Sequence, residues 1–166
     1  MLKISDIVKI VAAMVYKATD GSKYKYKITA DEDKQQQYIN NQIGCFFIDI
    51  HIAESKSVNL HFNEKKITID INCFPQKGQY KMDLYDIKDL LDKQFVRSIH
   101  VGDRYIHISN TESNILKDDI GYWMNYSIEV MYHEQVNFDV DDAALIGEIK
   151  LMTEVIIDGV KIERKV

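Results

Sequence analysis

The stretch from Cys45 to Pro75 reads CFFIDIHIAESKSVNLHFNEKKITIDINCFP, and it decides the fold. Near each end, every second residue is apolar and the residues between are mostly polar. Because side chains alternate between the two faces of a strand, this pattern predicts strands over residues 45–53 and 65–74, each with one apolar face. The polar region between them predicts an antiparallel pair, and Pro75 ends the second strand.

An amphipathic helix is predicted on each side of this strand pair. Residues 5–18 and residues 82–97 both carry apolar side chains at three- and four-residue spacing, which puts them on one face of a helix. Ser5 is the expected N-cap of the first helix, and Gly21 is the expected stop. The stripes consist of Ile7, Val11, Met14, Val15 and Ala18 in the first helix, and of Leu84, Ile87, Leu91 and Phe95 in the second.

Shorter strand signals complete the chain. They are residues 23–29, a hairpin over residues 99–108 around Gly102-Asp103, residues 122–132, and a C-terminal hairpin over residues 148–165 around Asp158-Gly159. The polar run of residues 31–41 predicts a loop. The expected fold is therefore α+β, a mainly antiparallel sheet with two amphipathic helices packed on one face and a C-terminal β-hairpin. We expect an α+β domain over residues 1–135 and an acidic linker with the hairpin over residues 136–166.

Composition narrows the classes of function. The chain has 166 residues and a net charge of −5, and no stretch concentrates enough lysine or arginine to favour free-standing binding to nucleic acid or to an anionic membrane. No apolar window is long enough for a transmembrane helix. The two cysteines, Cys45 and Cys73, favour reduced, packed thiols and a cytoplasmic setting.

No motif predicts a catalytic, cofactor or metal site. Asp49 and His51 share one side of a strand and could begin a metal site, yet a catalytic zinc needs three convergent protein ligands. His133-Glu134 lacks the second histidine of a zinc-protease motif, and the chain has no glycine-rich phosphate loop. A solvated sheet face is the expected role of Asp49 and His51, with a small metal-dependent hydrolase as the remote alternative. The candidates for further ligands are His61, Asp70, His100 and His107.

Two features predict contacts with other subunits. Trp123 falls on the more polar side of its strand, where it suits either a subunit interface or packing at a sheet edge. The C-terminal hairpin is apolar on one side and only marginally stable alone, so it is expected to dock on its own domain or on a neighbour's sheet. Its apolar residues are Ile149, Leu151, Val155 and Ile157.

The order of these blocks resembles the tail terminator proteins of long-tailed bacteriophages and of related prophage or tailocin clusters of Gram-positive bacteria. The resemblance covers residues 4–133 and rests on block order and hydrophobic rhythm. The blocks are SDIVKIVAAMVYK (5–17), GCFFIDIHIAES (44–55), KKITIDINCFPQ (65–76), YKMDLYDIKDLLDKQF (80–95) and GYWMNYSIEVMYHE (121–134).

The resemblance implies a virion structural protein and not an enzyme. Its members form a ring, expected to be a homohexamer, that caps the finished tail tube, stops elongation and offers the head-completion or neck protein a docking surface. The implied partners are other copies of the chain and the tail tube protein, with the sheath as a further candidate, and DNA passes through a negative lumen. The expected location is the neck end of the virion tail, after assembly in the host cytoplasm. Another head–tail connector or baseplate component is the nearest alternative, and residues 139–166 exceed the family pattern.

Overall fold

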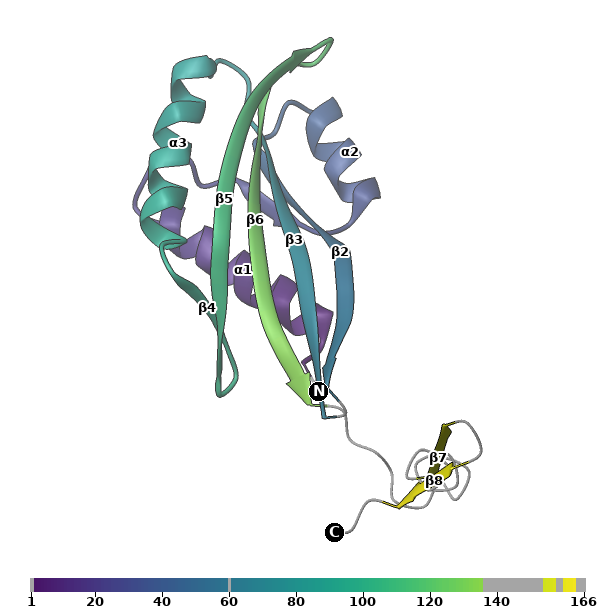
Figure 1. Cartoon of the computed structure of the whole chain (residues 1–166). Coiled ribbons are helices and arrows are strands. Elements are labelled where there is room, and N and C mark those ends of the chain that lie inside the picture. Colours follow the sequence, from purple (N-terminus) through teal and green to yellow (C-terminus); the bar gives the residue numbers. More distant parts are fainter. Residues whose placement is uncertain (1, 60, 136–153, 158–159, 164–166) are drawn as a thin grey trace. The chain divides into compact units, whose positions relative to one another are not determined.

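In the computed structural model, the chain divides into two compact units, Met1–Gln135 and Val136–Val166, each described by itself. The structure describes residues 2–59, 61–135, 154–157 and 160–163. Among these residues, the first unit contains helices and one six-stranded sheet (Figure 1). The α+β prediction is confirmed.

The sheet has the strand order β1-β2-β3-β6-β5-β4, and its four inner strands are long. These are β2 (Cys45–Asn59), β3 (Phe62–Phe74), β5 (Arg104–Asp118) and β6 (Gly121–Gln135). All neighbours among them pair antiparallel, as the two alternating segments predict for β2 and β3. Two short outer strands flank them, β1 (Lys27–Thr29), parallel to β2, and β4 (Ser98–Val101), antiparallel to β5.

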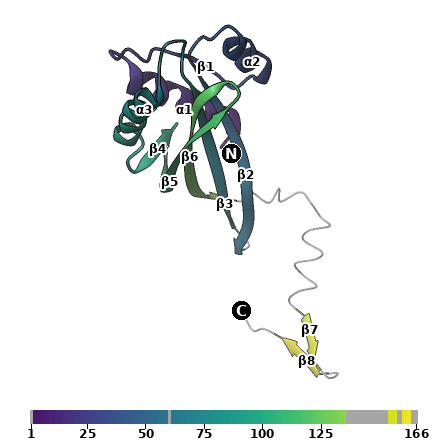
Figure 2. The same cartoon turned by 90° about the horizontal axis from the view of Figure 1, so that it is seen from above.

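Helices α1 (Ile4–Thr19) and α3 (Lys81–Gln94) cover one face of this sheet (Figures 1 and 2). Their predicted stripes face the sheet, and each buried aliphatic side chain contributes about 1.5–3 kcal/mol relative to its exposed state. The helices bury Ile7, Val11, Val15, Leu84, Ile87 and Leu91 against Ile69, Ile71, Met124 and Ile128 of β3 and β6. The prediction of two amphipathic helices on one face is therefore confirmed.

The helix ends differ slightly from the expected ones. Helix α1 begins one residue earlier than predicted, with Lys3 instead of Ser5 at the N-cap and no hydrogen bond from its side chain. Gly21 follows the helix with φ of +79°, a backbone conformation that favours glycine, so the predicted stop is confirmed. Helix α3 ends at Gln94, and Phe95 at its C-cap remains buried.

The predicted loop over residues 31–41 is wrong, because helix α2 spans Glu32–Asn40. Asp31 caps it by accepting hydrogen bonds from the backbone N–H groups of Asp33 at 2.9 Å and Lys34 at 3.2 Å. Glutamate, lysine and glutamine favour helices, and no glycine or proline interrupts them. Tyr38 and Ile39 of α2 pack with residues that alternate with those facing α1 and α3, so α2 lies on the other face of the sheet. These residues are Cys45, Phe47 and Phe74.

Two strands differ in length from the prediction. The strand expected over residues 23–29 is reduced to β1, although Tyr24 and Tyr26 are buried in the core as the alternation with lysine predicts. Strand β5 continues from the predicted hairpin to Asp118 through the polar sequence SNTESNILKD, which has no clear alternation. The second half of β5 therefore lacks the buried apolar face that makes β2 and β3 recognisable in the sequence.

The second unit contains the predicted hairpin. Strands β7 (Glu154–Ile157) and β8 (Val160–Glu163) pair antiparallel, with Val155 opposite Ile162 and Ile157 opposite Val160. Ile149, Leu151 and the expected turn Asp158-Gly159 lie outside the described residues.

Candidate functional site

The sheet face opposite α1 and α3 is polar across its middle, and we call it the polar face. Cross-strand register aligns its side chains in three rows from β2 through β3 and β6 to β5, and in one of them the Asn125 Nδ2 donates to Asn72 Oδ1 at 2.8 Å. Four carboxylates lie in these rows. The rows are Phe47, Asn72, Asn125 and Asn114; Asp49, Asp70, Ser127 and Glu112; and His51, Thr68, Glu129 and Asn110.

The predicted pair Asp49 and His51 lies in this face, and the structure adds Asp70 to it. The Nε2 atom of His51 is 3.2 Å from Asp49 Oδ2 and 3.2 Å from Asp70 Oδ2. Asp49 and Asp70 are directly opposite each other on β2 and β3, an arrangement that destabilises a sheet unless a donor lies between the like charges. The imidazole of His51 lies beside both carboxylates.

The other candidate ligands do not join this group. His100 on β4 stacks on Tyr105 with ring centroids 4.3 Å apart. His107 on β5 is separated from Asp49 by two strands, and His100 is separated from it by three. His61 lies at the β2–β3 turn. Within the described ranges, no three His, Cys, Asp or Glu residues are arranged to hold a metal ion. The geometry therefore gives the hydrolase alternative no support.

Both cysteines are free and buried, as predicted. Cys73 faces the main core, whereas Cys45 faces the α2 side, because Cys45 pairs with Phe74 and Phe46 pairs with Cys73. The two thiols therefore lie on opposite faces of the sheet, offset by one position in the register. Burial raises the pKa of the Cys45 thiol to about 11 and raises that of Cys73, so neither has the character of a reactive thiolate.

A groove with both polar and apolar lining lies at the end of the sheet where β5 turns into β6. It has a volume of about 610 Å³ and a floor formed by Phe74 and Trp123, whose stacked rings are 5.4 Å apart. Trp123 is half-buried in this stack and not fully exposed on the sheet surface. Large exposed apolar side chains surround the groove, namely Ile43, Tyr80, Ile120 and Tyr122.

Lysine side chains lie beside this groove. Lys81 Nζ is 5.8 Å from the centre of the Tyr122 ring, and Lys117 Nζ is 5.4 Å from it. Lysine over an aromatic face is a weakly attractive contact that leaves the ammonium group at the surface. The groove end of the sheet therefore combines exposed aromatic rings with charged side chains of both signs, since Asp119 also lines the groove.

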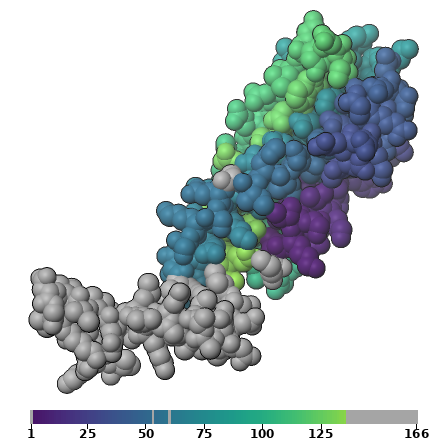
Figure 3. All heavy atoms as spheres, turned by 90° about the vertical axis from the view of Figure 1, so that its right-hand side faces the viewer, coloured from purple at the N-terminus to yellow at the C-terminus, as the bar shows by residue number. Residues whose placement is uncertain are grey.

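Both sides of the sheet have long strand edges that carry no neighbouring strand among the described residues. Strand β1 covers only Cys45–Phe47 of β2, and β4 covers only Arg104–His107 of β5. The Ile108 N–H donates to Arg97 O at 2.9 Å, so the open part of β5 begins at residue 109. Figure 3 faces the β2 side and shows atoms of β2 at the surface beyond α2. We call residues 48–59 the β2 edge and residues 109–118 the β5 edge.

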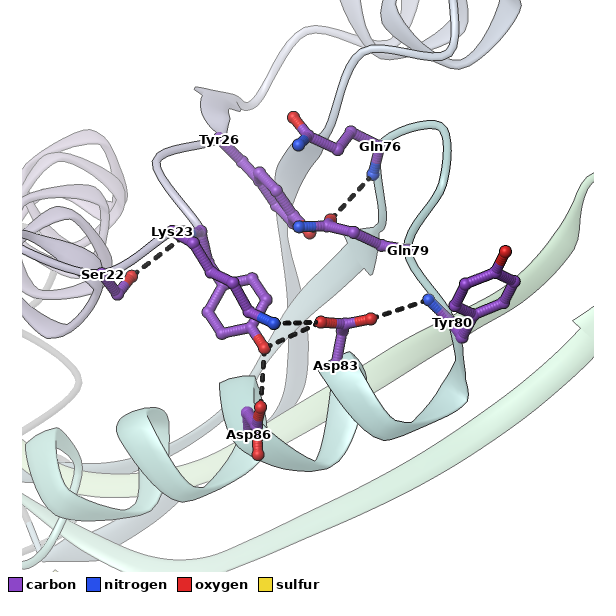
Figure 4. A network of polar contacts seen from close by, with 9 residues as sticks. Ser22, Lys23, Tyr26, Gln76, Gln79, Tyr80, Asp83 and Asp86 are labelled. Carbon is purple, nitrogen blue, oxygen red and sulfur yellow. Dashed lines mark hydrogen bonds and ion pairs between the residues drawn. The ribbon is translucent and has the colours of Figure 1, made fainter.

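A polar network fixes α3 to the segment that follows α1 (Figure 4). Asp83 accepts from Lys23 Nζ at 2.7 Å, from the Tyr24 hydroxyl at 3.0 Å and from the Tyr80 N–H at 2.8 Å. These donors, that of Lys23 first, lower the pKa of Asp83 to about 2. Burial, followed by the acceptors Asp86 and Asp83, raises the pKa of Tyr24. The network is structural, because it lies on the helix side of the sheet.

The structure describes only some of the interface residues predicted from the sequence. Trp123 lies in the groove, and Val155 and Ile157 lie in β7. The polar rows, the two edges and the contribution of α2 to the groove were not predicted. The even spacing of polar residues in β2 and β3 already indicated the polar face, but the cross-strand register that aligns Asp49 with Asp70 is not readable from the sequence.

Comparison with known proteins gives one family. The family model described as "Phage tail terminator protein" matches residues 6–142, which is most of the chain. No curated protein matches the sequence significantly. Among the described residues, no helix has the length and apolar character needed to cross a membrane.

Proposed function

Because this chain belongs to the phage tail terminator protein family, we propose that it caps the tail tube of a phage or tailocin as a homo-oligomeric ring. Membership makes the chain a structural component of a phage tail. The finer proposal is that the ring, with six copies, ends tube elongation and then presents a docking surface to a head-completion or neck protein. Assembly takes place in the host cytoplasm, and the finished ring lies at the neck end of the tail.

The polar face is the observation that carries the ring proposal. Helices α1 and α3 cover one side of the sheet, so the other side is the natural inner wall of a ring. Its middle rows contain the carboxylates of Asp49, Asp70, Glu112 and Glu129. A wall of this kind repels the phosphate backbone, so DNA passes along it without adhering.

The two ends of the sheet support separate partners on the two sides of the ring. The groove end exposes Tyr80 and Ile120 around the stacked Phe74 and Trp123, whereas the opposite end exposes Val58 and Phe62 at the β2–β3 turn. Exposed aromatic and aliphatic side chains beside a groove are typical of protein interfaces. A cap needs two dissimilar ends, because one meets the tube and the other meets the neck. Trp123 is thus proposed as a partner contact.

A tube-growth assay tests this proposal. Tail tube protein is polymerised with and without the purified chain, and tube lengths and tube ends are examined by negative-stain electron microscopy. We expect shorter tubes with a ring at one end. Trp123→Ala should weaken capping, while Tyr16→Ala, which removes an exposed ring from α1 far from the groove lining, should not. Unchanged tube growth at every concentration of the chain would contradict the proposal.

A further inference from the structure

The β2 edge and the β5 edge lie on opposite sides of one sheet (Figure 1) and have similar lengths. Over these residues, each strand is hydrogen-bonded to one neighbour only within the part of the chain that the structure describes. Unpaired N–H and C=O groups along a strand are a template for pairing with another chain. A protein with two such edges has two places where a sheet can be extended.

The strand directions allow the two edges to pair with each other across two copies. Pairing is antiparallel from β2 to β3, from β3 to β6 and from β6 to β5, so β2 and β5 run in opposite directions. When two copies stand side by side in the same orientation, β5 of one therefore meets β2 of the next antiparallel. Contacts between two different patches are the kind that close into a ring.

We propose that a second copy of this chain adds its β2 edge to the β5 edge of the first, so that neighbouring sheets continue as one antiparallel sheet around the ring. This inference rests on the proposed function and names the surface through which the copies meet. The polar faces of successive copies then form one continuous inner wall.

Closure of a sheet limits the register of this contact. Strands in a closed sheet tilt by about 35–45° relative to the axis of the ring. The tilt requires each copy to be shifted along the strand direction relative to its neighbour, and we call this shift, counted in residues, the stagger. Only an even stagger keeps the polar faces of neighbouring copies on the same side of the sheet. Each copy contributes four strands between its two edges. A strand rises by about 3.3 Å per residue, and neighbouring strands lie about 4.8 Å apart. For four strands per copy, a stagger of four residues therefore gives a strand tilt of about 34°, and a stagger of six residues gives a tilt of about 46°.

Charge complementarity selects between these two staggers. Within one copy Glu112 is level with Asp49, through Ser127 and Asp70. Positions along β2 are counted by their partners on β3, because β2 contains a bulge. Asp49 pairs with Asp70, Glu54 pairs with Lys66, and Lys56 pairs with Glu64. Glu54 therefore lies four positions beyond Asp49, and Lys56 lies six positions beyond it. A stagger of four places Glu112 against Glu54 of the next copy, whereas a stagger of six places it against Lys56. Opposite charges stabilise a cross-strand pair and like charges destabilise it, so the Glu112–Lys56 pair favours a stagger of six. The same register brings Asp118, at the end of β5, opposite Asp49, so like charges meet only at the last pair of the contact.

Apolar surface at the two edges agrees with this register. When Glu112 lies opposite Lys56 of the next copy, Ile115 lies three positions further along β5. The antiparallel partner three positions back along β2 is Ile52, because the bulge between Ile52 and Glu54 is not counted. Ile52 is 61% exposed on the single chain. A hollow of about 320 Å³ lies beside the β5 edge, lined by Val96, Thr111 and Ser113 among others.

Cysteine cross-linking tests the pairing. Glu112→Cys and Lys56→Cys alter two exposed side chains, and the native cysteines are buried, so neither fold nor background should interfere. We expect a covalent dimer when the two single variants are mixed at tube ends and oxidised. The double variant should give a covalent ladder that stops at the number of copies in the ring. Ser57→Cys is the matched control, because it neighbours Lys56 but faces the other side of the sheet, and its yield with Glu112→Cys should be about tenfold lower.

The possible outcomes separate this inference from the proposed function. Rings at tube ends together with a ladder specific to the 56–112 pair support both. Rings at tube ends with no such ladder, or with equal yields from Ser57→Cys, overturn the sheet continuation and leave the ring intact. Tubes with bare ends in the presence of the wild-type chain overturn the proposed function itself.

Discussion

At the scale of single residues, Asp83 joins the start of α3 to the segment that follows α1. Its carboxylate receives hydrogen bonds from Lys23, Tyr24 and the backbone of Tyr80. Asp83→Asn removes the charge that holds Lys23, which is largely exposed, so the expected loss is about 1 kcal/mol at pH 7 after allowance for solvent screening. Chemical denaturation measures it. Asp89→Asn, an exposed change on the same helix, is the control and should cost much less.

The Asp83 contribution also depends on pH. The folded-state pKa of about 2 lies below the ordinary value of 3.8, so the contribution is complete above that ordinary value and is lost as the pH falls toward 2. The stability difference between wild type and Asp83→Asn should therefore be constant from neutral pH to about pH 5 and shrink in more acidic buffer. A difference that grows on acidification would show that Asp83 is not held by these donors.

Gly44 is a second residue whose identity the structure requires. A Cβ atom at this position would collide with the ring of Tyr26, which is buried in the core. Gly44→Ala is expected to destabilise the fold by about 1–3 kcal/mol, as overpacking does. The cost should largely disappear in a Tyr26→Ala background, which a double-mutant cycle measures. An equal loss of stability from Gly44→Ala with and without the Tyr26 ring would show that the collision with this ring is not the cause.

At the scale of elements, α2 shows the effect of a single capping residue. Asp31 accepts two backbone hydrogen bonds at the start of this helix, and α2 buries little apolar surface of its own. Asp31→Ala is expected to cost about 1 kcal/mol and to loosen α2 in hydrogen exchange. Asp33→Ala is the matched control, because Asp33 lies in the same turn without capping it. Equal effects of the two changes would contradict the capping role.

The elements that could be predicted are those in which one face is buried. β2, β3, β6, α1 and α3 each place an apolar stripe in the core, so their periodicity indicates both type and orientation. The helix α2 and the second half of β5 could not be predicted in this way, because they are mostly polar and exposed. The polar face was only half readable, because the alternation in β2 and β3 places Asp49 and Asp70 on it, while the register that aligns them with Ser127 and Glu112 is not readable from the sequence.

At the scale of the whole molecule, the polar face predicts how the ring treats DNA. Asp70→Lys with Glu129→Lys changes two negative side chains of the inner wall to positive ones. Assembled rings of this variant should retain duplex DNA on a filter at low salt and release it at high salt, while wild-type rings retain none. Asp6→Lys with Asp89→Lys makes the same charge change on α1 and α3, outside the wall, and should retain much less. Equal retention by both variants would contradict the assignment of the inner wall.

The central claim is that copies of this chain assemble at the end of a tail tube and stop its growth. The most direct measurement is electron microscopy of growing tubes to which the purified chain is added, with the length of each tube and the density at its ends recorded. The account predicts a ring at one end of the tubes and a length that stops increasing once the rings are in place. Tubes that continue to lengthen with bare ends, at concentrations of the chain above that of tube ends, would contradict it.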